Sequence, residues 1–136
     1  MCDHPRNISD EQIKICAEQG GVIGVTGISL FLNDDANIST QSIIAHIDYI
    51  AELVGPEHVG IGLDYVVDQK ELDNFILNNP DSFKSIYQKK SQSIDYAVPE
   101  QLREIPELLA LRGYPGQSIE KIMGGNFARI AKSNWL

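Results

Sequence analysis

The sequence contains few of the features that mark secreted or membrane-spanning proteins. Cysteine occurs only twice among 136 residues, at Cys2 and Cys16, which is too few for a disulfide framework. No run of about 18 apolar residues is present and the N-terminus is polar, so neither a membrane-spanning helix nor a signal peptide is expected. We therefore expect a cytoplasmic protein that does not contact membranes.

Positive charge is also scarce. The 11 Lys and Arg residues are outnumbered by 19 Asp and Glu residues, which gives a formal net charge of -8 at pH 7. Such a field repels phosphate backbones, and no basic stripe offsets it, so nucleic-acid binding is not expected. The hydrophobic content of 43% is ordinary for a globular protein. A chain of this length supports one domain with its own core, so we expect residues 1–136 to form a single domain.

Clustered metal ligands are absent from the sequence. His4, His46 and His58 lie far apart, without His-x-His or His-Glu-x-x-His spacing, and neither cysteine belongs to a Cys-x-x-Cys motif. We therefore expect this chain alone to hold no metal ion. His46 and His58 are predicted to be structural or solvated. Cys16 lies on the apolar stripe of the first expected helix and is predicted to be a small buried residue.

What the sequence does contain is a strand–helix–strand pattern followed by helices. Short apolar runs without polar alternation predict strands that are covered on both faces, and Ser, Asp or Pro before apolar periodic segments predicts helix N-termini. The first expected elements are a helix opened by Ser9 and Gln12 and stopped at 20–21, a strand over 21–25, a loop over 26–38, a helix over 39–54 and a strand over 58–64. After these we expect a helix opened by Asp68, a helix from Pro80 through 87 and a loop over 88–97. The chain is then expected to end in three helices: one from Pro106 to Gly113, a short one capped by Ser118 that breaks at 124–125, and a last one capped by Asn126 that ends near 132.

Two confident strands are few for an α/β protein. Two parallel strands alone leave unpaired edges and half-covered apolar faces. We therefore expect the sheet to be completed by another copy of the chain, which would make it a homo-oligomer, by a missing portion of protein, or by rearrangement.

Three segments of the chain resemble one family of enzymes. They are Cys-Asp-His-Pro-Arg-Asn-Ile-Ser-Asp at 2–10, Val-Gly-Ile-Gly-Leu-Asp at 59–64 and Met-Gly-Gly-Asn-Phe-Ala-Arg-Ile at 123–130. In this order and spacing they resemble the C-terminal part of the renal (membrane) dipeptidase family of zinc peptidases. The resemblance implies an α/β fold that is the C-terminal portion of a (β/α)8 TIM-like barrel, with its last two parallel strands plus helices. A complete barrel needs about 250 residues, so this barrel would be incomplete.

The resemblance also assigns roles to segments of the chain. Residues 1–64 correspond to the last βα units, 65–100 to a variable loop and helical insertion, and 101–136 to the C-terminal helices. Asp64 follows a strand at the end where barrel active sites lie, and the resemblance implies that it handles the proton of the attacking water. The alternative is a strand-end Asp that caps a loop. The family commonly continues Asp-Phe-Asp-Gly where this chain has Asp-Tyr-Val-Val at 64–67, which puts a second acidic residue in doubt.

Two further residues are implied to bind substrate. Arg6 matches the arginine that holds the free carboxylate of a dipeptide, a task that suits the planar guanidinium fork. Phe31 matches an aromatic residue placed over the substrate. The alternatives are an exposed arginine at a helix entrance and a loop hydrophobe. Asn126 is predicted to be structural.

The implied function is that of the C-terminal segment of a zinc-dependent dipeptidase, in which metal-activated water hydrolyses the peptide bond. The full-length family holds two zinc ions, and the resemblance places every ligand before residue 1 of this chain. We therefore expect the isolated chain to hold no zinc and to be inactive, and the dipeptide to be the substrate of the complete enzyme. The alternative is a non-catalytic remnant that folds and self-associates.

Overall fold

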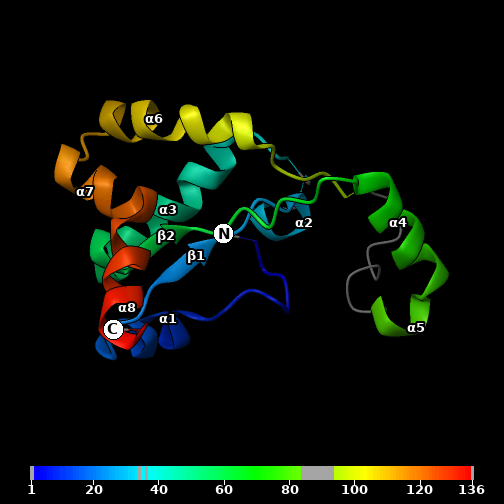
Figure 1. Ribbon diagram of the computed structural model, residues 1–136, viewed down its shortest axis with the longest axis horizontal. Coiled ribbons are helices and arrows are strands. Elements are labelled where there is room, and N and C mark those ends of the chain that lie inside the picture. Colours follow the sequence, from blue (N-terminus) through cyan, green and yellow to red (C-terminus); the bar gives the residue numbers. More distant parts are fainter. Residues whose placement is uncertain (1, 34, 36, 84–93, 136) are drawn as a thin grey trace.

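The computed structural model describes residues 2–33, 35, 37–83 and 94–135. They form a mixed α/β structure in which two short parallel strands lie among helices (Figure 1). In chain order the elements are α1 (Asp10–Glu18), β1 (Ile23–Val25), α2 (Ser29–Leu32), α3 (Thr40–Val54), the 3-10 turn η1 (Pro56–His58), β2 (Val59–Ile61), α4 (Gln69–Asn78), α5 (Pro80–Phe83), the 3-10 turn η2 (Pro99–Arg103), α6 (Ile105–Leu111), α7 (Gly116–Glu120), the π-helical turn η3 (Lys121–Gly125) and α8 (Asn126–Trp135).

The two strands pair in parallel, and α3 makes the crossover between them. Ile23 lies opposite Val59, and Val25 lies opposite Ile61. The pairing continues beyond the strands, because the backbone N–H of Gly27 donates to the carbonyl of Leu63 at 3.0 Å. The expected strand–helix–strand unit is therefore present, with shorter strands than the sequence predicts.

Each strand presents a different surface on its two faces, since alternate side chains point in opposite directions. The core side carries β-branched side chains, namely Ile23, Val25, Val59 and Ile61. The other side carries glycines, of which Gly24 and Gly62 are exposed. Phe127 of α8 covers Gly60, where a Cβ would come within 2.4 Å of the ring. The expectation that both faces are covered therefore holds at Gly60 but not at Gly24 and Gly62, where glycine hides the alternation in an apolar run.

Three helices begin where the sequence predicts. The Ser9 hydroxyl accepts the backbone N–H of Gln12, and the Gln12 side chain accepts the N–H of Ser9 in return. Ser39 caps α3, and the Asp68 carboxylate caps α4 by accepting the N–H of Glu71 at 2.9 Å. The apolar stripe of α3 is buried against the strands, α1 and α6. Its buried isoleucines are Ile43, Ile44, Ile47 and Ile50.

Other expected features differ from the structure. The expected loop over 26–38 contains α2, whose four residues are all buried. Packing against the rest of the chain stabilises this helix, which is too short to show a periodic pattern in the sequence. α7 begins at Gly116, before Ser118, which is therefore not its cap. Cys16 is half-buried rather than buried. Parts of the helix expected through 87 and the loop expected over 88–97 lie outside the described residues, since 84–93 are not described.

Asn126 is structural, but it is not an N-cap. Its backbone is already helical, with φ -67° and ψ -44°, and its side chain is buried. Nδ2 donates to the carbonyl oxygens of Pro56 at 2.8 Å and Val59 at 2.7 Å. Asn126 therefore fastens the start of α8 to the start of β2, and α8 continues to Trp135 rather than ending near residue 132.

The helices surround the strands unevenly. α1, α3 and the α6–α8 segment gather around the sheet, whereas α4 and α5 stand apart at one end of the molecule (Figure 1). Across the described ranges, no helix is long and apolar enough to cross a membrane.

Candidate functional site

The carboxyl ends of β1 and β2 meet at one edge, and Asp64 lies there. It follows β2 by three residues, is exposed, and has φ 57°. Among the described residues it is the only non-glycine residue with positive φ. A side chain in this left-handed region is uncommon and often marks a functional position. No residue in the described part of the chain donates a hydrogen bond to its carboxylate, which is open to solvent.

Arg6 and Phe31 come together although 25 positions separate them. Phe31 lies on α2, directly after the carboxyl end of β1, and is only 9% exposed. The Arg6 guanidinium carbon lies 5.4 Å from the centroid of its ring. The His4 ring packs edge-on against the same ring, with centroids 4.8 Å apart. The arrangement can hold an anion, because the exposed guanidinium keeps its N–H donors available.

The N-terminal loop that carries Arg6 is fastened to α2. Nδ2 of Asn7 donates to the carbonyl of Phe31 at 2.9 Å and to the carbonyl of Cys2 at 3.1 Å. The Cys2 thiol is buried and donates to the carbonyl of Leu30 at 3.4 Å. Sequence reasoning did not single out His4 or Asn7 for this site. The available signal was that both lie within two residues of Arg6.

The structure does not join all three predicted site residues. Arg6 and Phe31 form one cluster, whereas no hydrogen bond or ring contact connects Asp64 to either of them within the described ranges. Phe31 and Asp64 nevertheless lie on the segments that follow β1 and β2 at the same edge of the sheet.

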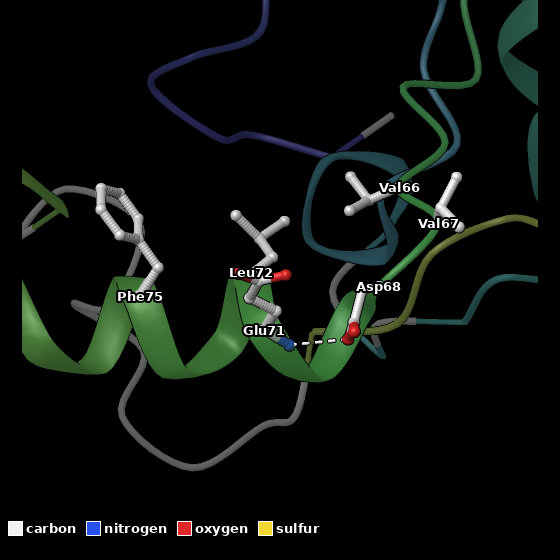
Figure 2. Close-up of a pocket in the computed structure, with 6 residues that line it drawn as sticks. All are labelled: Val66, Val67, Asp68, Glu71, Leu72 and Phe75. Carbon is white, nitrogen blue, oxygen red and sulfur yellow. Dashed lines mark hydrogen bonds between the residues drawn. The ribbon is translucent and has the colours of Figure 1, made fainter.

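A shallow groove follows Asp64 along the chain, and sequence reasoning missed it. It has a volume of about 540 Å³. Figure 2 shows the Leu72 and Phe75 side chains on one side of α4, next to the segment that carries Val66 and Val67. Its lining residues are Val66, Val67, Asp68, Glu71, Leu72 and Phe75. The signal in the sequence was the apolar pair directly after the Asp64–Tyr65 dipeptide.

The histidines of α3 and η1 serve the backbone. Nε2 of His46 lies 2.6 Å from the carbonyl oxygen of Leu32, so this nitrogen carries the proton and donates it. Burial lowers the pKa of His46 below its ordinary value of 6.5, although the hydrogen bond to Leu32 opposes that shift. Nδ1 of His58 lies 2.9 Å from the carbonyl oxygen of Gly21. No group of three or more His, Cys, Asp or Glu in the described part of the chain is arranged to hold a metal ion. The described side chains therefore do not form a donor set that fits a resident metal ion.

Comparison with known proteins identifies the family. The sequence model of the membrane dipeptidase family (peptidase family M19) matches residues 1–93. The chain belongs to this family. The predicted resemblance is therefore confirmed, and it covers the segments that carry Arg6, Phe31 and Asp64.

Individual relatives agree with this assignment. The dipeptidase ataJ of Aspergillus terreus is 32% identical over 94% of this chain, which spans 27% of that protein. An uncharacterized protein from the pqqA 5′ region of Klebsiella pneumoniae is 27% identical over 99% of this chain, which spans 43% of it. A crystal structure of an amidohydrolase from Pseudomonas aeruginosa superimposes with a TM-score of 0.76 and 28% identity over 96% of this chain and 41% of its own. The chain thus spans less than half the length of each of these proteins.

Proposed function

We propose that this chain supplies the last two strands of a (β/α)8 barrel and the substrate-facing loops of a zinc-dependent dipeptidase. Three observations support the proposal: the parallel β1–β2 pair with its helical crossover, the similarity to an amidohydrolase structure, and membership of the membrane dipeptidase family. The observation that carries it is Asp64, an exposed carboxylate in a left-handed conformation at the carboxyl end of β2. Active sites of such barrels lie at this end of the strands.

In this proposal each residue has one task. The Asp64 carboxylate accepts a proton from the water that attacks the scissile carbonyl and returns it to the leaving amine. The Arg6 guanidinium binds the free C-terminal carboxylate of the dipeptide through paired N–H donors. Phe31 belongs to the same substrate-binding region. Zinc has no donor set among the described residues, so no step is assigned to a metal held by this chain.

The proposal is tested by titrating isotope-labelled chain with a dipeptide and with the same dipeptide as its C-terminal amide. NMR signals of Arg6 and of the residues around Asp64 should move with the dipeptide, and those of Arg6 should move much less with the amide. Release of free amino acids is measured in parallel, with and without added zinc, and we expect none from the chain alone.

The alternative is a non-catalytic segment that folds and self-associates, which the lack of a metal donor set in the described residues favours. Failure of both Arg6 and Asp64 to respond to the dipeptide would support this alternative against a dipeptidase site. Zinc-dependent release of amino acids that is lost in Asp64→Asn would instead show that the chain is catalytic by itself, contrary to our expectation.

A further inference from the structure

We infer that Phe31 is a positioning residue, whose ring is a platform that orients the Arg6 guanidinium for a substrate carboxylate. The inference rests on the proposed carboxylate-binding role of Arg6. In this inference Phe31 does not contact the substrate itself. It holds Arg6, which does. The juxtaposition of Arg6, Phe31 and His4 carries the inference.

The ring of Phe31 has little surface left for a substrate. Its side chain lies on α2 and only 9% of the residue is exposed. His4 packs edge-on against the ring, with an angle of 61° between the ring planes, and Arg6 lies over it with its guanidinium carbon 5.4 Å from the centroid. A substrate therefore meets Arg6 before it meets Phe31.

The geometry leaves the binding edge of Arg6 available. An aromatic ring attracts the cation through its face, whereas a carboxylate binds the N–H donors along the edge of the guanidinium plane. The two interactions are therefore compatible. Within the described part of the chain no carboxylate pairs with Arg6, which is exposed. An arginine that is held in place before the substrate arrives loses less conformational freedom on binding.

Asn7 fixes the backbone on which this platform depends. Its side-chain N–H groups donate to the carbonyl of Phe31 in α2 and to that of Cys2 in the N-terminal loop. The backbone N–H of Asn7 donates to the carbonyl of His4 at 2.8 Å, and that of Arg6 donates to Nδ1 of His4 at 3.2 Å. The turn over 4–7 is thus tied to α2, and Arg6 is kept above the ring.

The experiment uses the full 136-residue chain and three variants. Phe31→Leu keeps apolar bulk but removes the ring, and Phe31→Tyr keeps the ring. Phe83→Leu is the matched control on α5, because the Phe83 ring packs against Phe75, with centroids 5.9 Å apart, and does not line the groove beside Asp64. Two quantities are measured by NMR: the ring-current shift of the Arg6 side-chain CH₂ protons without ligand, and the Kd for the dipeptide and its C-terminal amide.

We expect the ring-current shift in the native chain, Phe31→Tyr and Phe83→Leu, and its loss in Phe31→Leu. Phe31→Leu should also bind the dipeptide about two- to fivefold more weakly, the range that an exposed cation–π contact provides, with the amide unaffected. Phe31→Tyr should retain the native affinity for the dipeptide.

Three results would overturn the inference. Equal dipeptide affinity in the native chain and Phe31→Leu would show that Phe31 does not position Arg6, while the proposed function stands. Direct contacts between the dipeptide and the Phe31 ring, seen as nuclear Overhauser effects, would restore a substrate-contacting role. No binding of the dipeptide by the native chain would refute the carboxylate role of Arg6, and the inference would fail with it.

Discussion

At the scale of single residues, Asp64 combines an exposed carboxylate with a backbone conformation that most residues avoid. The left-handed region brings Cβ close to the following carbonyl oxygen, and Asp and Asn tolerate it better than other non-glycine residues because their short polar side chains can hydrogen-bond locally. The chain therefore keeps a strained position after β2 and fills it with a residue that can also move a proton. A structural cap would need a hydrogen bond to the Asp64 carboxylate, and no described residue supplies one.

Substitutions at Asp64 separate these two properties. Asp64→Asn keeps the tolerance of positive φ and removes the charge, so its free energy of unfolding should stay within about 0.5 kcal/mol of the native value. Asp64→Ala lacks that tolerance and should lose about 1 kcal/mol. Urea unfolding of the three proteins measures both changes. Equal destabilisation in the two variants would show that the carboxylate has a structural role after all.

His46 should make the stability depend on pH. Burial depresses its pKa in the folded chain, so the unfolded chain binds the proton first as the pH falls through about 6.5. Stability is therefore fully present above this pH and declines below it, until the folded-state pKa is reached. Urea unfolding between pH 7.5 and 5 should show the decline. His46→Gln should remove the part of this decline that His46 causes. A pH profile of stability that is the same in this variant as in the native chain would contradict the prediction.

At the scale of elements, the molecule fastens its helices to the strands through side chains that bind backbone carbonyls. Asn126 ties α8 to the start of β2, and Arg129 donates to the carbonyls of Gly20 and Glu57 at 2.9 and 3.0 Å. Both contacts lie at the amino ends of the strands, opposite Asp64. Stability and the candidate chemistry therefore occupy opposite ends of the sheet, as is typical of barrel enzymes.

Loss of the Asn126 contacts should be costly. Asn126→Ala removes a buried side chain whose Nδ2 donates to two carbonyl groups, so both lose a partner in a region that water does not reach easily. The free energy of unfolding should fall by about 1–3 kcal/mol. Asn134→Ala is the control, because its side chain bonds locally on the exposed end of α8 and should change stability by less than about 0.5 kcal/mol. Equal effects in the two variants would contradict the role of Asn126.

The elements also show which features were predictable. Ser9, Ser39 and Asp68 cap helices through neighbours three residues away, so their signals are local and were predicted correctly. Asn126 binds groups 67 and 70 positions away. Its location in a Gly-Gly-Asn sequence indicated an N-cap. The tertiary contact that decides its role leaves no signal in the local sequence, so it was not predicted.

The candidate site divides in the same way. Asp64 could be found because it follows its strand closely, and Arg6 because it lies in a recognisable segment just before a helix. The contact of the Arg6 guanidinium with the Phe31 ring depends on how α2 folds back against the N-terminal loop, so only the structure shows it. α2 itself was missed because a buried four-residue helix carries no periodic pattern.

At the scale of the whole molecule, the chain leaves much of its sheet and several large apolar side chains uncovered. Within the described ranges the sheet consists of β1 and β2 alone, so each strand pairs on one side only. Gly24 and Gly62 are exposed on its glycine face. Large apolar side chains that are mostly exposed include Val67, Leu77, Leu111 and Trp135. Unpaired edges and apolar surface of this kind favour association.

We therefore predict that the 136-residue chain self-associates, forming a symmetric dimer that pairs or covers these edges. Light scattering at micromolar concentration should give twice the mass of one chain. In Gly24→Lys the measured mass should shift toward that of the monomer, because a charged side chain on an edge strand blocks pairing with another chain. The position can accept the side chain, since a Cβ there lies 3.5 Å from its nearest neighbours. Gly116→Lys is the control, because it adds the same charge on α7, where a Cβ has no neighbour within 4 Å, and the dimer should persist. A folded native chain that scatters as a monomer would show that α8 and the loop over 94–97 already cover the sheet well enough.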